Sequence, residues 1–103
     1  MRLTQADDGR HVTATVGETL TLTLPETPGT GYRWSPEMPG GGVLHTDEGL
    51  FTPGGGGIGG GGTRTFEVRA VGAGEATLRL ALRRAWEGEA PPERTFTVTV
   101  TVR

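Results

Sequence analysis

A strict alternation of apolar and polar residues constrains this chain more than any other feature. In ETLTLTL, at positions 18–24, leucines occupy every second position from Leu20 and threonines stand between them. Segments 64–71, 76–84 and 96–102 alternate in the same way, and HVTATV at 11–16 follows a similar pattern. Successive side chains of a β-strand point to opposite faces, so this pattern predicts strands with one buried face. The predicted inward residues are Leu20, Leu22, Leu24, Phe66, Val68, Ala70, Ala76, Leu78, Leu80, Leu82, Phe96, Val98, Val100 and Val102.

Turn-forming residues separate these strands at the short spacing that is typical of sandwiches and barrels, and no segment shows a useful helical periodicity. We therefore predict an all-β fold, an immunoglobulin-like antiparallel β-sandwich of about seven strands, formed by one domain over residues 1–103. The chain contains no cysteine, so the sandwich has no disulfide and lacks the cysteine pair of antibody domains.

Composition excludes several classes of partner. The formal net charge of -2 argues against a nucleic-acid-binding surface, and no apolar stretch approaches the roughly 20 residues that a membrane-spanning helix needs. The opening residues, MRLTQADDGR, lack the apolar region of a signal peptide. A leader removed earlier would leave the same sequence, so a secreted, a periplasmic and a cytoplasmic location all stay open.

Catalytic and metal chemistry find little support in the residue inventory. Ser35 is the sole serine, and neither His11 nor His45 stands beside a nucleophile in the sequence. The spacing of His45, Asp47 and Glu48 matches no known metal-ligand pattern. We expect a protein that is not an enzyme and that holds neither a metal nor a cofactor.

The glycine tract at 54–62 resembles a phosphate-binding loop only superficially. Such a loop needs a Lys-Ser/Thr pair that opens a helix, whereas Thr63 and Arg64 open a predicted strand. We interpret the tract as a flexible connection. Ile58, the apolar residue within it, is a candidate contact with a partner.

Trp86 follows the strand at 76–84 and allows two interpretations. Continued alternation turns it inward to cover one end of the core, whereas an exposed position beside Arg84 has the composition of a binding hot spot. Alternate loops of an antiparallel sandwich fall at the same end. The turn at 25–30, the tract at 54–62 and the loop that carries Trp86 are therefore expected at one end of the molecule, where loops on a rigid scaffold build a binding surface.

With these three loops together, nearly the whole chain resembles the chagasin-type inhibitors of papain-like cysteine peptidases. The first loop of that family has the pattern Asn-Pro-x-Thr-Gly-Tyr/Phe-x-Trp, the second is glycine-rich and runs into Gly-Thr-x-x-Phe, and the third carries Arg-Pro-Trp. The order and the spacing of all three agree. The matching residues are 27–34 (TPGTGYRW) in the first loop, Gly62, Thr63 and Phe66 in the second, and Arg84, Ala85 and Trp86 in the third.

The resemblance implies a monomeric, reversible and competitive inhibitor that wedges its three loops into the active-site cleft of a cathepsin L-type protease. Thr30 would lie nearest to the catalytic cysteine, the bare backbone of the second loop would approach one wall of the cleft, and Trp86 would pack on the other. The protease-binding residues that it implies are Thr27, Pro28, Gly29, Thr30, Gly31, Gly59, Gly60, Gly61, Gly62, Thr63, Arg84, Ala85 and Trp86.

Three positions depart from the family pattern, and each predicts some loss of affinity. Thr27 replaces Asn, and its hydroxyl is expected to take over part of the bracing that the amide supplies. Gly29 stands where Thr is common, and Ala85 stands where the family has Pro, so both loops lose stiffness.

Two interpretations compete with this one. An immunoglobulin-like carbohydrate-binding or adhesion module would need Trp86 to stack on a sugar but would tolerate changes at Thr30 and Gly31. A structural accessory domain would tolerate changes at all three positions. Within the first loop, Tyr32 and Trp34 share one face by the period of two, so we expect both to anchor the strand beneath the working turn.

Overall fold

The computed structural model describes residues 1–38, 41–54, 61–84, 86 and 91–103. These residues form strands and two single turns of 3₁₀ helix, η1 (Gln5–Asp7) and η2 (Pro28–Thr30). No helix among them is both long and apolar enough to cross a lipid bilayer. In chain order, the strands are β1 (Arg2–Thr4), β2 (His11–Ala14), β3 (Thr19–Glu26), β4 (Tyr32–Met38), β5 (Leu44–Thr46), β6 (Leu50–Pro53), β7 (Gly62–Ala70), β8 (Gly74–Arg84) and β9 (Arg94–Val102).

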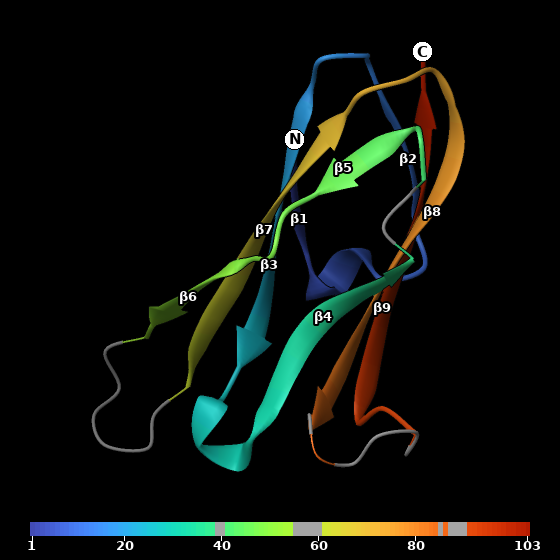
Figure 1. Cartoon of the computed structure of the whole chain (residues 1–103). Coiled ribbons are helices and arrows are strands. Elements are labelled where there is room, and N and C mark those ends of the chain that lie inside the picture. The colour runs from blue at the N-terminus through green and yellow to red at the C-terminus, as the bar shows by residue number, and fades with distance from the viewer. Residues whose placement is uncertain (39–40, 55–60, 85, 87–90) are drawn as a thin grey trace.

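The strands form two sheets that pack face to face (Figure 1). One sheet has the order β1-β3-β7-β5, with β6 also paired to β7, and the other has the order β2-β9-β8-β4. The predicted all-β, immunoglobulin-like sandwich without disulfides is confirmed.

The core lies between the sheets and contains the residues that the alternation places inward. Ala76 and Leu82 are partly buried and pack against it, while every other residue of the predicted inward set is at most 2% exposed. Trp34 of β4 joins them at 1% exposed. Each large apolar side chain buried in this way stabilises the fold by about 1.5–3 kcal/mol, so the alternation itself largely determines which face of each strand turns inward.

The described residues form nine strands where about seven are predicted, and the alternation gives no signal for the short strands β1, β5 and β6. Strands β5 and β6 both pair with β7, at successive parts of its length, and so continue one line that is interrupted at residues 47–49. At the interruption, the Asp47 carboxylate accepts the N–H groups of Gly49 and Glu67 at 3.0 and 3.1 Å. This turn keeps both short strands beside β7.

The sandwich is also not wholly antiparallel, since β1 pairs parallel with β3 and β2 pairs parallel with β9. The N-terminal segment crosses from one sheet to the other through η1, so β1 and β2 join the edges of different sheets. At the crossing, the backbone N–H of Thr4 donates to Asp7 at 2.8 Å and Arg10 forms an ion pair with it. Both interactions lower the pKa of the Asp7 carboxyl.

The strand ends that carry the three loops lie at one end of the molecule, the lower end in Figure 1. The register explains why: Glu26 at the end of β3 pairs with Gly62 at the start of β7, and Tyr32 at the start of β4 pairs with Arg84 at the end of β8. The predicted clustering of the loops is therefore confirmed for the strands that flank them.

Gly49 tests how closely the core packs near this end. It has φ +80, and a Cβ added to it would lie 2.7 Å from a ring carbon of Phe66. We expect Gly49→Ala to lower the free energy of unfolding by about 2–5 kcal/mol, from backbone strain and overpacking together. Urea denaturation measures this loss.

Gly9 supplies the matched control, because it has φ +83 but no atom within 4 Å of an added Cβ. Gly9→Ala should therefore show the backbone strain alone, about 1–2 kcal/mol. Equal losses in the two variants would contradict the close contact between Gly49 and Phe66.

Candidate functional site

The first loop is a tight turn with a defined start and end. Pro28 fixes φ in the first position of η2, and Gly31 ends the turn in the left-handed region at φ 83, ψ -8. The N–H of Thr30 donates to the carbonyl of Thr27 at 3.1 Å, and the N–H of Gly31 donates to the carbonyl of Pro28 at 2.9 Å. Proline at one end and glycine at the other therefore shape the loop locally.

The side chain that braces this turn is Thr30. Its hydroxyl donates to the Thr27 carbonyl at 2.7 Å and accepts the N–H of Tyr32 at 3.3 Å. The expectation that the Thr27 hydroxyl braces the loop is wrong, since Thr27 makes no side-chain capping bond. Its hydroxyl oxygen instead lies beside Gly61, 2.9 Å from where a Cβ on that residue would be.

Arg84, at the end of β8, joins the third loop to the first. Its Nε donates to the carbonyl of Thr30 at 2.9 Å. Its guanidinium carbon lies 4.3 Å from the centre of the Tyr32 ring and 5.8 Å from that of the Trp86 ring, both within the range of a cation–π contact. One arginine thus contacts two aromatic rings and the backbone of the first loop.

Trp86 packs over Gly31 and is otherwise exposed. A Cβ on Gly31 would overlap the Trp86 ring, so the ring reaches this position only because residue 31 has no side chain. Trp86 as a whole residue remains 72% exposed. Of the two interpretations of Trp86, the exposed one is therefore confirmed, because β8 ends at Arg84 and the alternation does not continue to position 86.

The two aromatic residues that follow the first loop differ in their roles. Trp34 is buried, as predicted, and its indole N–H donates to the Pro25 carbonyl at 2.8 Å. Tyr32 is half-buried and supports Arg84 at the surface. The predicted anchoring of β4 in the core is thus confirmed for Trp34, while Tyr32 contributes through the arginine that stacks on it.

A buried ion pair lies directly beneath the loops. Glu26 and Arg64 are 4% and 8% exposed, and they are the buried charged residues among those that the structure describes. Arg64 donates from Nε and from one terminal nitrogen to the two carboxylate oxygens, at 2.7 and 2.9 Å. The sequence-based site does not include either residue, although both continue the inward phase of their strands.

The glycines where the second loop meets β7 have a structural use inside the protein. A Cβ on Gly62 would overlap the carbonyl oxygen of Thr52 on the neighbouring strand β6. The N–H of Gly54 donates to the carbonyl of Gly61 at 3.1 Å, which closes the base of the loop. Bare backbone at positions 61 and 62 thus lets β3, β6 and β7 approach one another.

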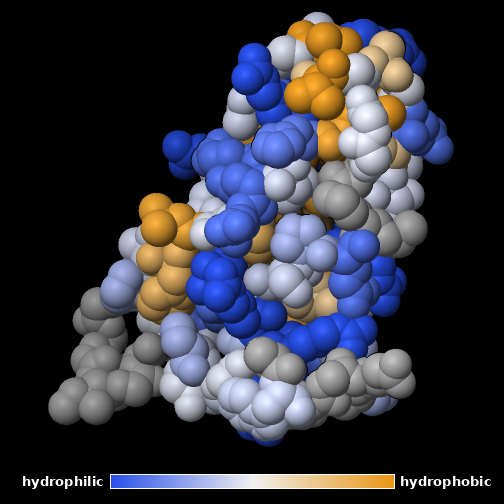
Figure 2. Space-filling view, viewed as in Figure 1, coloured by the Kyte–Doolittle hydropathy of each residue, from blue (hydrophilic) through white to orange (hydrophobic). Residues whose placement is uncertain are grey.

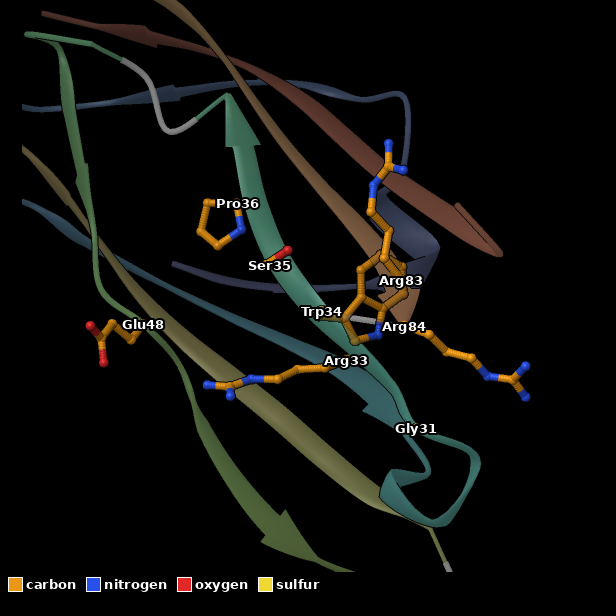
Figure 3. Close-up of a pocket in the computed structure, with 8 residues that line it drawn as sticks. All are labelled: Gly31, Arg33, Trp34, Ser35, Pro36, Glu48, Arg83 and Arg84. Carbon is orange, nitrogen blue, oxygen red and sulfur yellow. The ribbon is translucent and has the colours of Figure 1, made fainter. Parts of the chain in front are cut away.

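A groove extends from the first loop along β4, at the open edge of the sandwich (Figure 3). Arg83, which lines the groove, donates to Glu37 outside it, and Arg79 does the same; these hydrogen bonds lower the pKa of the Glu37 carboxyl. The lining of the groove combines three arginines with apolar surface. Its lining residues are Gly31, Arg33, Trp34, Ser35, Pro36, Glu48, Arg83 and Arg84.

An apolar surface that the sequence analysis misses lies on β6. Leu50 is 72% exposed, as much as Trp86, and Figure 2 shows the apolar patch over this strand beside a largely hydrophilic face. The segment at 50–53 has no alternation, so the sequence carried little signal for it.

The described residues do not assemble a catalytic or metal-binding set. Ser35 lies on β4 and His11 on β2, which are opposite edges of one sheet, while His45 belongs to the other sheet. No group of three or more His, Asp or Glu residues in the described ranges could hold a metal ion.

The structure brings together the first loop (Thr27, Pro28, Gly29, Thr30 and Gly31), Arg84 and Trp86. Gly61, Gly62 and Thr63 lie beside the start of that loop, across the β3–β7 register. Gly59, Gly60 and Ala85, as well as Ile58, lie outside the described residues.

We expect Gly31→Ala to displace the Trp86 ring and to lower the free energy of unfolding by about 1–2 kcal/mol, since φ at this position is positive. NMR contacts between residue 31 and the indole ring report the displacement. Gly29→Ala is the control, because Gly29 has neither a positive φ nor an atom within 4 Å of an added Cβ. Unchanged indole contacts in the Gly31 variant would contradict the packing described above.

Comparison with known proteins agrees with this geometry. Chagasin from Trypanosoma cruzi is 31% identical over 102 residues, covering 94% of this chain and 93% of chagasin. The crystal structure of a cysteine protease inhibitor from Entamoeba histolytica has a TM-score of 0.83 at 22% identity, with 99% and 93% of the two chains covered. The solution structure of amebosin has a TM-score of 0.82 at 29% identity, with 100% and 97% covered.

A family profile described as chagasin family peptidase inhibitor I42 matches residues 13–100, which include all three loops. This match covers most of the chain and agrees in extent with the identity to chagasin. The chain therefore belongs to the chagasin family of peptidase inhibitors.

Proposed function

We propose that this chain is a reversible, competitive inhibitor of papain-like cysteine proteases and that its three loops fill the active-site cleft of the enzyme. Membership of a peptidase-inhibitor family supports the inhibitory role. The observation that carries the mode of binding is the contact between two loops at one end of the sandwich. There, Arg84 and Trp86 of the third loop pack against Thr30 and Gly31 of the first.

The hydrogen bonds of the first loop explain how it blocks a protease without being cut. Cleavage requires a carbonyl group placed in line with the nucleophile and free to be polarised by an oxyanion hole. In this loop, the carbonyls of Thr27, Pro28 and Thr30 already accept hydrogen bonds from within the protein. The loop would cover the catalytic cysteine while these three carbonyl oxygens stay occupied, which disfavours cleavage at the bonds that follow them.

Trp86 supplies the main apolar contact in this proposal. Large aromatic side chains dominate binding energies when they become buried at the centre of an interface. Trp86 offers a mostly exposed ring, and its contact with Gly31 holds that ring beside the first loop. We propose that the ring packs on one wall of the protease cleft, and that the second loop, from Gly59 to Thr63, approaches the other wall.

Three loops of this size fit an interface of roughly 800 Å² on each partner, the usual area for a protease and its inhibitor. The role is one of binding and not of catalysis. In support of this, Ser35, His11 and His45 lie on strands that the sheet order keeps apart.

The direct test is inhibition of active papain or a cathepsin L-type enzyme, measured with a fluorogenic peptide at several substrate concentrations. We expect competitive, reversible inhibition. Trp86→Ala should weaken it by roughly 30- to 1,000-fold, the equivalent of about 2–4 kcal/mol for a central tryptophan. The absence of inhibition at micromolar concentrations, across several papain-like enzymes, would disprove the proposal.

Thr30 separates this function from sugar binding. Thr30→Ala removes the hydroxyl that braces the first loop and should weaken inhibition, whereas Thr30→Ser keeps the hydroxyl and should restore most of it. Sugar stacking would depend on Trp86 but be indifferent to both Thr30 variants. Retention of glycan binding without any protease inhibition would favour that other class of function.

A further inference from the structure

We infer that Glu26 and Arg64 are a positioning pair, whose buried ionic contact sets the geometry of the first and second loops. The link to protease binding rests on the proposed function, whereas the link to loop geometry rests on the structure alone. Neither residue belongs to the loops, and neither is accessible enough to contact a partner.

The contact is bidentate and almost completely buried. The side chains of Glu26 and Arg64 are 1% and 10% exposed, and the two hydrogen bonds between them measure 2.7 and 2.9 Å. The backbone N–H of Trp34 donates to the same carboxylate at 3.1 Å. Among the described residues, no buried side-chain nitrogen or oxygen atom lacks a hydrogen-bond partner.

Four segments that lead into the loops converge on this pair. Glu26 is the last residue of β3, directly before the turn of the first loop at residues 27–31, and Trp34 lies on β4, the strand that follows this turn. Arg64 lies on β7, directly after the second loop, which ends at Thr63. Arg64 also donates to the carbonyl of Gly49 at 3.4 Å, in the turn before β6, which leads into the second loop from the other side.

The energetics of buried ion pairs favour a geometric role over a purely stabilising one. Replacing both members of such a pair by apolar residues of similar volume is often neutral or stabilising, because two charges no longer have to be desolvated. An apolar pair has no directional bonds, however. The bonds of Glu26 and Arg64 fix where β3, β4 and β7 lie relative to one another at the point where the loops begin.

The test is the double variant Glu26→Gln/Arg64→Met. Glutamine keeps an acceptor for the N–H of Trp34, and methionine fills much of the arginine volume, so the variant removes the ionic contact without leaving one charge buried. We expect a folded protein whose inhibition constant for papain rises about tenfold or more, which corresponds to about 1.4 kcal/mol of binding free energy.

A core variant at the far end of the sandwich provides the matched control for stability. Val100→Ala enlarges the core around a residue that is 0% exposed, and Val100 lies in the part of β9 that pairs with β2, away from the loops. It should lower the melting temperature yet leave the inhibition constant within about twofold of the wild-type value when the protein is folded. Inhibition that weakened as much in this control would overturn the positioning role.

Amide hydrogen exchange gives a readout that does not depend on any protease. The amides of Thr30 and Gly31 are hydrogen-bonded within the first loop, and the amide of Thr99 donates to the Arg10 carbonyl far from it. In the double variant, exchange at Thr30 and Gly31 should accelerate by about tenfold while exchange at Thr99 stays unchanged. Unchanged exchange at all three amides, together with wild-type inhibition, would overturn the inference.

The same measurement separates failure of this inference from failure of the proposed function. If the wild-type protein does not inhibit papain but exchange at Thr30 and Gly31 is faster in the double variant, the positioning pair is supported. Only the proposed target is then contradicted.

Arg64→Lys is the second variant, in case the double variant does not fold. Lysine keeps the buried positive charge, but its single ammonium group cannot reproduce the two parallel hydrogen bonds that the arginine guanidinium makes to both carboxylate oxygens. It should give the same loop-specific acceleration of exchange, and wild-type exchange in this variant would contradict a role for the bidentate geometry.

Discussion

The rest of the binding end depends on the buried contact between Glu26 and Arg64. Over most of its length the sandwich is closed by apolar side chains that have no preferred direction of contact, and these determine which faces meet. At the end that carries the loops, an ionic pair takes their place and adds hydrogen bonds whose directions are fixed. The first loop begins and ends within reach of this pair, since Glu26 precedes it and Trp34 follows it. The loop therefore starts from defined points on a rigid support.

Above this support, the loops stabilise one another with few contacts. The Thr30 hydroxyl braces the first loop from within, and the Arg84 guanidinium holds it from the end of β8. The glycine at position 31 allows the Trp86 ring to approach the loop backbone. Such contacts reduce the conformational freedom that a loop must lose on binding, which is a main determinant of affinity for interfaces of a given area. The glycines of the chain therefore do not all make the loops more flexible. Gly31 and Gly62 permit close approaches that any side chain would prevent, whereas Gly29 has open space around it.

The sequence predicts the core well because alternation and burial have the same physical cause. It also carried a signal for the positioning pair, since Glu26 continues the inward phase of Leu20, Leu22 and Leu24, and Arg64 precedes Phe66 in the same phase. Only the register between β3 and β7 shows that these two opposite charges meet.

The position of Trp86 depends on where β8 ends, which alternation alone does not determine. The short strands β5 (LHT) and β6 (LFTP) were missed because neither segment alternates apolar and polar residues. The bracing role expected of Thr27 belongs instead to Thr30, since the extended backbone at Thr27 turns its hydroxyl toward the second loop.

The most direct test of this account is the crystal structure of the complex with papain, compared with the free protein. Because Glu26 and Arg64 hold the loops in their binding geometry in the free protein, we expect the backbone of residues 27–31 to move by less than about 1 Å on binding. We also expect Trp86 to become buried against the protease, with the hydrogen bonds between Glu26 and Arg64 intact. A first loop that refolds to enter the cleft, or a complex that leaves Trp86 exposed, would contradict the account.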